Sequence, residues 1–129
     1  MSGGSEISIL LVEDEPAILR MVTIMLQRQG YSVLPASTPG EAVRLAREYA
    51  GHLDLLITDV VMPEMNGRDL SKLIRNIRPE VKCMFTSGYT DNVIAHHGVL
   101  DEDVWFLPKP FSMNDLALKV HQALGAKRL

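Results

Sequence analysis

The chain has little that would tie it to a membrane, a nucleic acid or an oxidising compartment. It contains one cysteine, Cys83, which cannot form an internal disulfide and suits a reducing compartment as a small buried side chain. No apolar run approaches the roughly 18 residues that a membrane-spanning helix needs. The N-terminus also lacks the basic and then apolar segments of an export signal. The formal net charge is −3 and Lys and Arg form no dense cluster, which gives direct nucleic-acid binding little support. We therefore expect a cytoplasmic domain that neither inserts into a membrane nor binds nucleic acid directly.

The bulk composition is that of one ordinary globular domain. The chain has 129 residues, of which 47% are hydrophobic and 22% charged, so it is long enough to bury a core. It has no low-complexity segment and no internal linker. We expect residues 1–5 to be a flexible leader, residues 6–125 to form the domain and residues 126–129 to be a C-terminal tail.

Strand and helix signals alternate along the domain. Apolar, β-prone segments predict strands at 7–12, 31–34, 53–58, 81–86 and 104–107. Helical spacing of apolar residues predicts helices between 16 and 30, 38 and 51, 66 and 79, 90 and 97, and 112 and 125. This alternation implies a parallel sheet with right-handed crossovers and helices on both faces. The predicted fold class is therefore α/β, with a doubly wound five-stranded parallel sheet of (β/α)5 form.

Local start and stop signals support these helices. Pro16 suits the first position of its helix, and Gly30 is expected to end it. The segments Thr38–Glu41 and Ser112–Asp115 have the spacing of capping boxes. Gly125 is expected to close the last helix.

Polar side chains follow four of the predicted strands. They are Glu13 and Asp14, Asp59, Ser87 and Lys109. In doubly wound sheets the ligand lies beyond the carboxyl ends of the strands, so these side chains are expected to meet at one edge. Converging carboxylates repel each other and need a cation, and oxygen ligands favour Mg²⁺, Mn²⁺ or Ca²⁺ over zinc. Mg²⁺ fits best because it pairs readily with phosphoryl oxygens. The set predicts phosphoryl transfer to Asp59, with charge stabilised by the metal, Lys109 and the Ser87 hydroxyl.

The four fragments, in this order, resemble the receiver domain of a two-component response regulator over residues 6–125. The fragments are Leu11–Glu15, Asp59–Gly67, Thr86–Tyr89 and Leu107–Phe111. The resemblance implies a flavodoxin-like receiver fold with strand order 2-1-3-4-5. It also implies a signalling switch, not a metabolic enzyme, which takes its phosphoryl group from a histidine kinase or a histidine phosphotransfer protein.

The resemblance assigns a role to each residue of the acidic site. Asp59 is expected to be the phosphoacceptor and, with Asp14 and the backbone carbonyl of Val61, to ligate Mg²⁺ directly. Glu13 is expected to act on the metal through water. Lys109 is expected to pair with the phosphoryl group, and in this family the peptide bond from this lysine to the following proline is often cis.

Two further residues are implied as the switch. Ser87 is expected to move to bond the phosphoryl group, and Phe106 to rotate inward. Phe106 stands where tyrosine is common, so only its packing role carries over. Thr86 is an adjacent hydroxyl, and strand alternation would point only one of the two into the site. The small residue Gly88 after Ser87 matches the family pattern and favours Ser87.

Two other functions remain open. A metal-dependent phosphohydrolase would use an aspartyl-phosphate intermediate, but such sites usually carry a second aspartate where Val61 stands. An interaction module that keeps only the fold is disfavoured by the complete set of site residues. Within the family, the chain is either the receiver of a hybrid histidine kinase, which segments 86–90 and 106–111 favour, or a stand-alone regulator. Val61 and Tyr89 occupy positions that tune hydrolysis in this family, and they predict slower loss of the phosphoryl group than a Val61→Asn variant would show. His96 and His97 are predicted to be a surface pair.

Overall fold

A computed structural model describes residues 7–87 and 104–127 of the chain. The leader at 1–5, the helix predicted between 90 and 97, and its neighbours Gly88 and Tyr89 lie outside the described residues. The described residues form one five-stranded parallel sheet in the order β2-β1-β3-β4-β5. The predicted doubly wound sheet and its strand order are therefore confirmed.

The strands and helices follow one another in the predicted sequence. The strands are β1 (Ser8–Val12), β2 (Ser32–Ala36), β3 (Leu55–Asp59), β4 (Lys82–Ser87) and β5 (Val104–Pro108). The helices are α1 (Pro16–Arg28), α2 (Pro39–Glu48), α3 (Gly67–Ile77) and α5 (Met113–Lys127). None of the helices within 7–87 and 104–127 has the length and apolar character that crossing a membrane requires.

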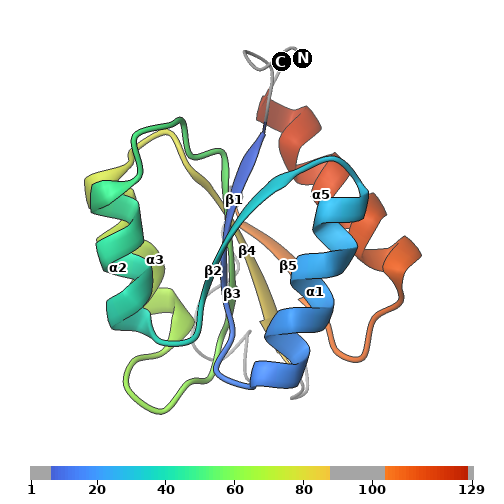
Figure 1. Ribbon diagram of the computed structural model, residues 1–129, viewed down its shortest axis with the longest axis horizontal. Coiled ribbons are helices and arrows are strands. Elements are labelled where there is room, and N and C mark those ends of the chain that lie inside the picture. The colour runs from blue at the N-terminus through green and yellow to red at the C-terminus, as the bar shows by residue number, and fades with distance from the viewer. Residues whose placement is uncertain (1–6, 88–103, 128–129) are drawn as a thin grey trace.

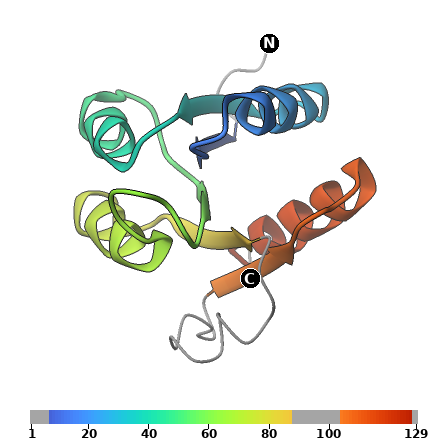
Figure 2. The same cartoon turned by 90° about the horizontal axis from the view of Figure 1, so that it is seen from below.

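The helices cover the sheet in two layers. Helices α1 and α5 lie on one face, and α2 and α3 lie on the other (Figures 1 and 2). The central strand β3 is buried along its whole length. Its side chains alternate between the two cores, with Leu55 and Ile57 on the α1/α5 side and Leu56 on the α2/α3 side. By the same alternation Asp59 faces the α1/α5 side and Thr58 faces α2 and α3.

The predicted helix caps are present. Thr38 Oγ1 accepts a 3.1 Å hydrogen bond from the Glu41 N–H, and Ser112 Oγ accepts one of 3.0 Å from the Asp115 N–H. Asp115 closes the box by accepting from the Ser112 N–H at 3.1 Å. Gly30 has a φ of 95°, the left-handed conformation that glycine adopts without strain, and it ends α1 as predicted.

Several strand and helix boundaries differ from the prediction, most of them by one or two residues. Strand β2 runs on through Pro35 to Ala36, which is tolerated because β2 is an edge strand and pairs only with β1. Strand β3 begins at Leu55, two residues later than predicted. Helix α5 continues past Gly125 to Lys127, since one glycine inside a helix costs only about 1 kcal/mol relative to alanine.

Candidate functional site

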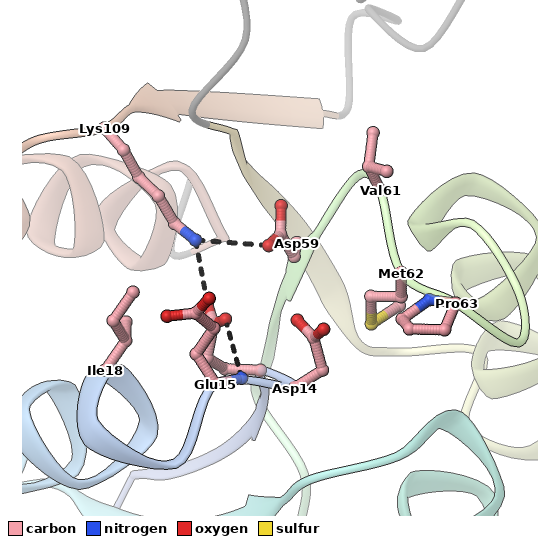
Figure 3. Close-up of a pocket in the computed structure, with 9 residues that line it drawn as sticks. Asp14, Glu15, Ile18, Asp59, Val61, Met62, Pro63 and Lys109 are labelled. Carbon is pink, nitrogen blue, oxygen red and sulfur yellow. Dashed lines mark hydrogen bonds and ion pairs between the residues drawn. The ribbon is translucent and has the colours of Figure 1, made fainter.

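The predicted acidic residues meet at the carboxyl edge of the sheet. One carboxylate oxygen from each of Glu13, Asp14 and Asp59 lies within 4.8 Å of the other two. They line a pocket of about 520 Å³ whose lining residues come from the segments that follow β1, β3 and β5 (Figure 3). The lining residues are Glu13, Asp14, Glu15, Ile18, Asp59, Val61, Met62, Pro63 and Lys109.

The strand register explains this convergence. Strands β1 and β3 are neighbours, with Val12 paired to Thr58, so the next residues along each strand, Glu13 and Asp59, come side by side. On the other side of β1, the Glu13 N–H continues the pairing with β2 by donating to Ala36 O at 3.1 Å. Both Glu13 and Asp59 are buried, with 3% and 8% of their surface exposed. Carboxylates are seldom buried in this way unless a partner offsets their charge.

Lys109 is that partner for both carboxylates. Its Nζ donates hydrogen bonds to Glu13 Oε1 at 2.9 Å and to Asp59 Oδ2 at 3.1 Å. Figure 3 shows the lysine reaching across from the end of β5 to Asp59. The other oxygen of Glu13, Oε2, accepts from the Glu15 N–H at 3.2 Å. The Lys109–Pro110 peptide bond is cis, as the family resemblance led us to expect.

Burial and the lysine act in opposite directions on the acids. Burial raises the pKa of Asp59 above its usual value, and the nearby Lys109 ammonium offsets this only in part. The pKa of Glu13 is raised for the same reason, again against the hydrogen bond from Lys109. Burial alone would lower the pKa of Lys109, but its contacts with Glu13 and Asp59 outweigh this effect and raise it. The pocket therefore disfavours the ionised forms of Glu13 and Asp59 unless more positive charge enters.

The donor set suits a hard divalent cation. Three carboxylates against one ammonium leave a formal charge of −2. All three carboxylates offer oxygen atoms, which Mg²⁺ prefers over nitrogen or sulfur ligands. Asp14 extends into the pocket from the end of β1 (Figure 3). The residues present thus fit a divalent cation, which would favour the ionised forms of Glu13 and Asp59.

The loop after Asp59 is held by backbone bonds. The Val60 N–H donates to Thr86 O at 2.9 Å, and the Gly67 N–H donates to Val60 O at 2.7 Å. A Cβ at Gly67 would lie 2.2 Å from Asp59 O, so only glycine allows α3 to begin this close to the end of β3. The side chain of Val61 is 43% exposed at the rim of the pocket and carries no polar group toward it.

The two predicted switch residues stand outside the pocket lining. Ser87, the last residue of β4, is fully buried, and its carbonyl accepts from the Lys109 N–H at 2.8 Å. The residue that pairs with Asp59 in the register is Thr86, not Ser87. Phe106 is half-buried and pairs with Phe85. The roles of Ser87 and Phe106 in switching therefore stay predictions.

Four lining residues were not predicted as part of the site. They are Glu15, Ile18, Met62 and Pro63, to which the sequence patterns assign no role in the site. The rim residues come from the first turn of α1 and from the loop after β3, which both start at the acidic residues. Closeness in sequence to Asp14 and Asp59 was the signal that would have found them.

Comparisons with known proteins match this chain to one family of domains. Residues 9–121 match the family model described as the response regulator receiver domain. The chain is 40% identical over 124 residues to the sensor kinase CckA of Brucella abortus, covering 96% of this chain but 13% of that protein. It is 32% identical to the response regulator receiver protein CpdR of the same organism, covering 92% of this chain and 97% of that protein.

Solved structures agree in fold. The receiver domain of the hybrid histidine kinase CckA superposes with a TM-score of 0.77 at 40% identity, covering 91% of this chain and 98% of that one. The response regulator TrrA of Thermotoga maritima, solved in complex with Mg²⁺ and a beryllium fluoride, gives a TM-score of 0.74 at 28% identity. That match covers 92% of this chain and 99% of that one.

Proposed function

This chain belongs to the response regulator receiver domain family of two-component signalling, and we propose that it accepts a phosphoryl group on Asp59 in a Mg²⁺-dependent reaction. The observation that carries the proposal is the 3.1 Å contact between Lys109 Nζ and Asp59 Oδ2, beside two further carboxylates. A buried carboxylate already paired with a lysine is a nucleophile with a cation at hand for the incoming phosphoryl oxygens.

The transfer follows from these positions. An oxygen of ionised Asp59 attacks phosphorus, the new O–P bond forms, and the P–N bond of the phosphohistidine breaks with its electron pair returning to the imidazole. Lys109 then pairs with the transferred group. The hydrogen bond to Glu13 Oε1 keeps the Lys109 ammonium in the pocket. Asp14, Asp59 and the Val61 carbonyl would hold Mg²⁺ directly and Glu13 would act on it through water, and the bound cation would supply positive charge near the phosphoryl oxygens.

The phosphoryl group would then bias a two-state surface. Ser87 would turn to bond the phosphoryl group, and Phe106 would rotate inward. Ser87 is linked to Lys109 through its carbonyl at 2.8 Å, so a change at the phosphoryl group has a direct route to the end of β4. Such a shift needs only that phosphorylation stabilise one state more than the other.

The partner is a phosphohistidine protein, either a histidine kinase or a histidine phosphotransfer protein. The chain covers 13% of CckA but 97% of CpdR, so its relatives include both a multidomain kinase and a protein of its own length. We propose that it acts in the cytoplasm as the receiver of a hybrid kinase or as a stand-alone regulator. It is not expected to bind nucleic acid or insert into a membrane.

A phosphohydrolase is the less favoured function. An aspartyl-phosphate hydrolase needs a general acid near the nucleophile, and the position two residues after Asp59 holds Val61, whose apolar side chain lies at the pocket rim. A generic phosphate ester is therefore expected to show no turnover.

The test is phosphorylation by acetyl phosphate, followed by intact mass. Wild type is expected to gain one phosphoryl group only with Mg²⁺, and Asp59→Asn none. Asp69→Asn, an exposed acid in the first turn of α3, is the matched control and is expected to behave as wild type. Labelling of Asp59→Asn at the wild-type level would refute the assignment of the phosphoacceptor. A wild type that stays unlabelled by acetyl phosphate and by a phosphohistidine protein would refute the function.

A further inference from the structure

Thr58 is a fully buried polar residue directly before the phosphoacceptor. Its side chain lies on the α2/α3 side of the sheet, away from the pocket, where 0% of it is exposed. Its hydroxyl donates a 3.0 Å hydrogen bond to the carbonyl oxygen of Asp59, and Met62 Sδ lies 3.9 Å from the same hydroxyl. A buried hydroxyl that bonds the next residue's carbonyl restricts the rotation of that peptide unit.

The peptide unit between Asp59 and Val60 is thus held at both ends. Its carbonyl accepts from Thr58, and its N–H donates to Thr86 O at 2.9 Å. The following carbonyl, that of Val60, accepts from the Gly67 N–H at 2.7 Å. These bonds fix the path of the chain from Asp59 to Val61.

The packing around this unit is close. A Cβ at Gly67 would lie 2.2 Å from Asp59 O and 3.2 Å from Thr58 Cγ2, so the start of α3 packs closely against both residues. Little room is left for a water molecule to replace the hydroxyl, because a bridging water needs its own volume and partners. Loss of the hydroxyl would therefore leave the Asp59 carbonyl without this donor in a crowded, buried position.

We propose that Thr58 is a positioning residue for the phosphoacceptor site. Its hydroxyl sets the orientation of the peptide after Asp59, and so the direction in which the Asp59 carboxylate and the Val61 carbonyl face the pocket. The inference rests on the proposed function and deepens it, since both groups are expected to hold the same cation. Mg²⁺ demands near-octahedral geometry, so a small rotation of one peptide displaces two of its ligands together.

The test compares Mg²⁺ affinity by calorimetry between wild type and Thr58→Val. Valine keeps the shape that packs on Gly67 and Met62 but has no hydroxyl. Loss of this hydrogen bond is expected to weaken Mg²⁺ binding about three- to tenfold. Phosphorylation by acetyl phosphate is expected to slow at low Mg²⁺ and to recover as Mg²⁺ is raised.

Thr23→Val is the matched control. Thr23 Oγ1 donates to Leu19 O at 2.7 Å within α1, so the substitution removes the same kind of bond away from Asp59. It is expected to keep the wild-type Mg²⁺ affinity. A melting curve for each variant separates lost stability from lost positioning.

Folded Thr58→Val with a Mg²⁺ affinity within about twofold of wild type would overturn the inference, whatever its melting temperature. If this variant does not fold, Thr58→Ser and Thr58→Ala replace it, because both lack the methyl group and differ only in the hydroxyl. Equal affinities for that pair would overturn the inference as well. A wild type that binds Mg²⁺ more tightly than Thr58→Val but never takes up phosphate would support the role of Thr58 and sink the proposed function instead.

Discussion

Lys109 Nζ lies 2.9 Å from Glu13 Oε1, so the lysine is anchored by a residue other than Asp59, the proposed phosphoacceptor. The two residues are 96 positions apart in the chain and come from the ends of β1 and β5, which are not neighbours in the sheet. With Glu13 as a second partner, Lys109 would stay in the pocket during the proposed phosphorylation, in which the Asp59 oxygen that it also contacts becomes part of an acyl phosphate.

Lys109→Ala is therefore expected to slow phosphorylation more than it weakens metal binding. In the proposed reaction the lysine stabilises charge on the transferred group, whereas the carboxylates that are proposed to hold Mg²⁺ remain. We expect the rate with acetyl phosphate to fall by about 100-fold, the range seen when one preorganised charge-stabilising donor is removed. Lys72→Ala, an exposed lysine on α3, is the control and should match wild type. Equal rates for Lys109→Ala and wild type would remove Lys109 from the mechanism.

The raised pKa of Asp59 predicts a stability effect without metal. An acid whose pKa is higher in the folded protein binds more protons there, so stability falls as pH rises from the unfolded toward the folded pKa. In EDTA, Asp59→Asn is expected to melt at a higher temperature than wild type at pH 7, with the difference shrinking toward pH 3. Thermal melts across this range measure it. A variant that melts below wild type at pH 7 would contradict the prediction.

Mg²⁺ should offset the loss of stability that ionised Asp59 causes in wild type. A cation that binds only the folded state stabilises it by about 2.7 kcal/mol when present at 100 times its dissociation constant. We expect Mg²⁺ to raise the melting temperature of wild type and to have a much smaller effect on Asp59→Asn, which lacks one anionic ligand. Removing the metal with EDTA should return wild type to its starting value. Equal Mg²⁺ stabilisation of the two proteins would place the metal elsewhere.

Gly67→Ala should damage both stability and the site. Its Cβ would stand 2.2 Å from Asp59 O, so the backbone of β3 or α3 has to move. We expect a loss of about 2 kcal/mol in the free energy of unfolding, typical of overpacking, together with weaker Mg²⁺ binding. Gly40→Ala in α2 has nothing within 4 Å of the new Cβ and is expected to be neutral or stabilising in the same urea titration.

Val61 should slow the loss of the phosphoryl group. Its side chain lies at the pocket rim and offers no polar atom to orient an attacking water. Val61→Asn is expected to lose the phosphoryl group several-fold faster, because the amide can hold that water. Val61→Ala, which changes size but not polarity, is the control. Intact mass over time measures both, and an asparagine variant as slow as wild type would refute the role.

The sequence predicted the alternation of strands and helices. It also predicted the helix caps at Thr38 and Ser112 and the end of α1 at Gly30. Each depends on residues within a few positions of one another, and that is the range over which periodicity and capping act. The predicted strands also indicated that Glu13, Asp14, Asp59 and Lys109 would lie close together, since parallel strands bring their carboxyl ends to one edge of the sheet. Boundaries were less predictable, because pairing with a neighbouring strand lets β2 continue through Pro35.

The sequence by itself determined the fold class and the types of side chain that gather at the site, because both reside in local patterns and in side chains placed after strands. Only the tertiary structure decided which atoms meet. It paired Thr86 rather than Ser87 with Asp59, joined Lys109 to Glu13, and pressed Gly67 against the Asp59 carbonyl. These relationships depend on strand register and on packing between distant segments, and no local pattern contains either.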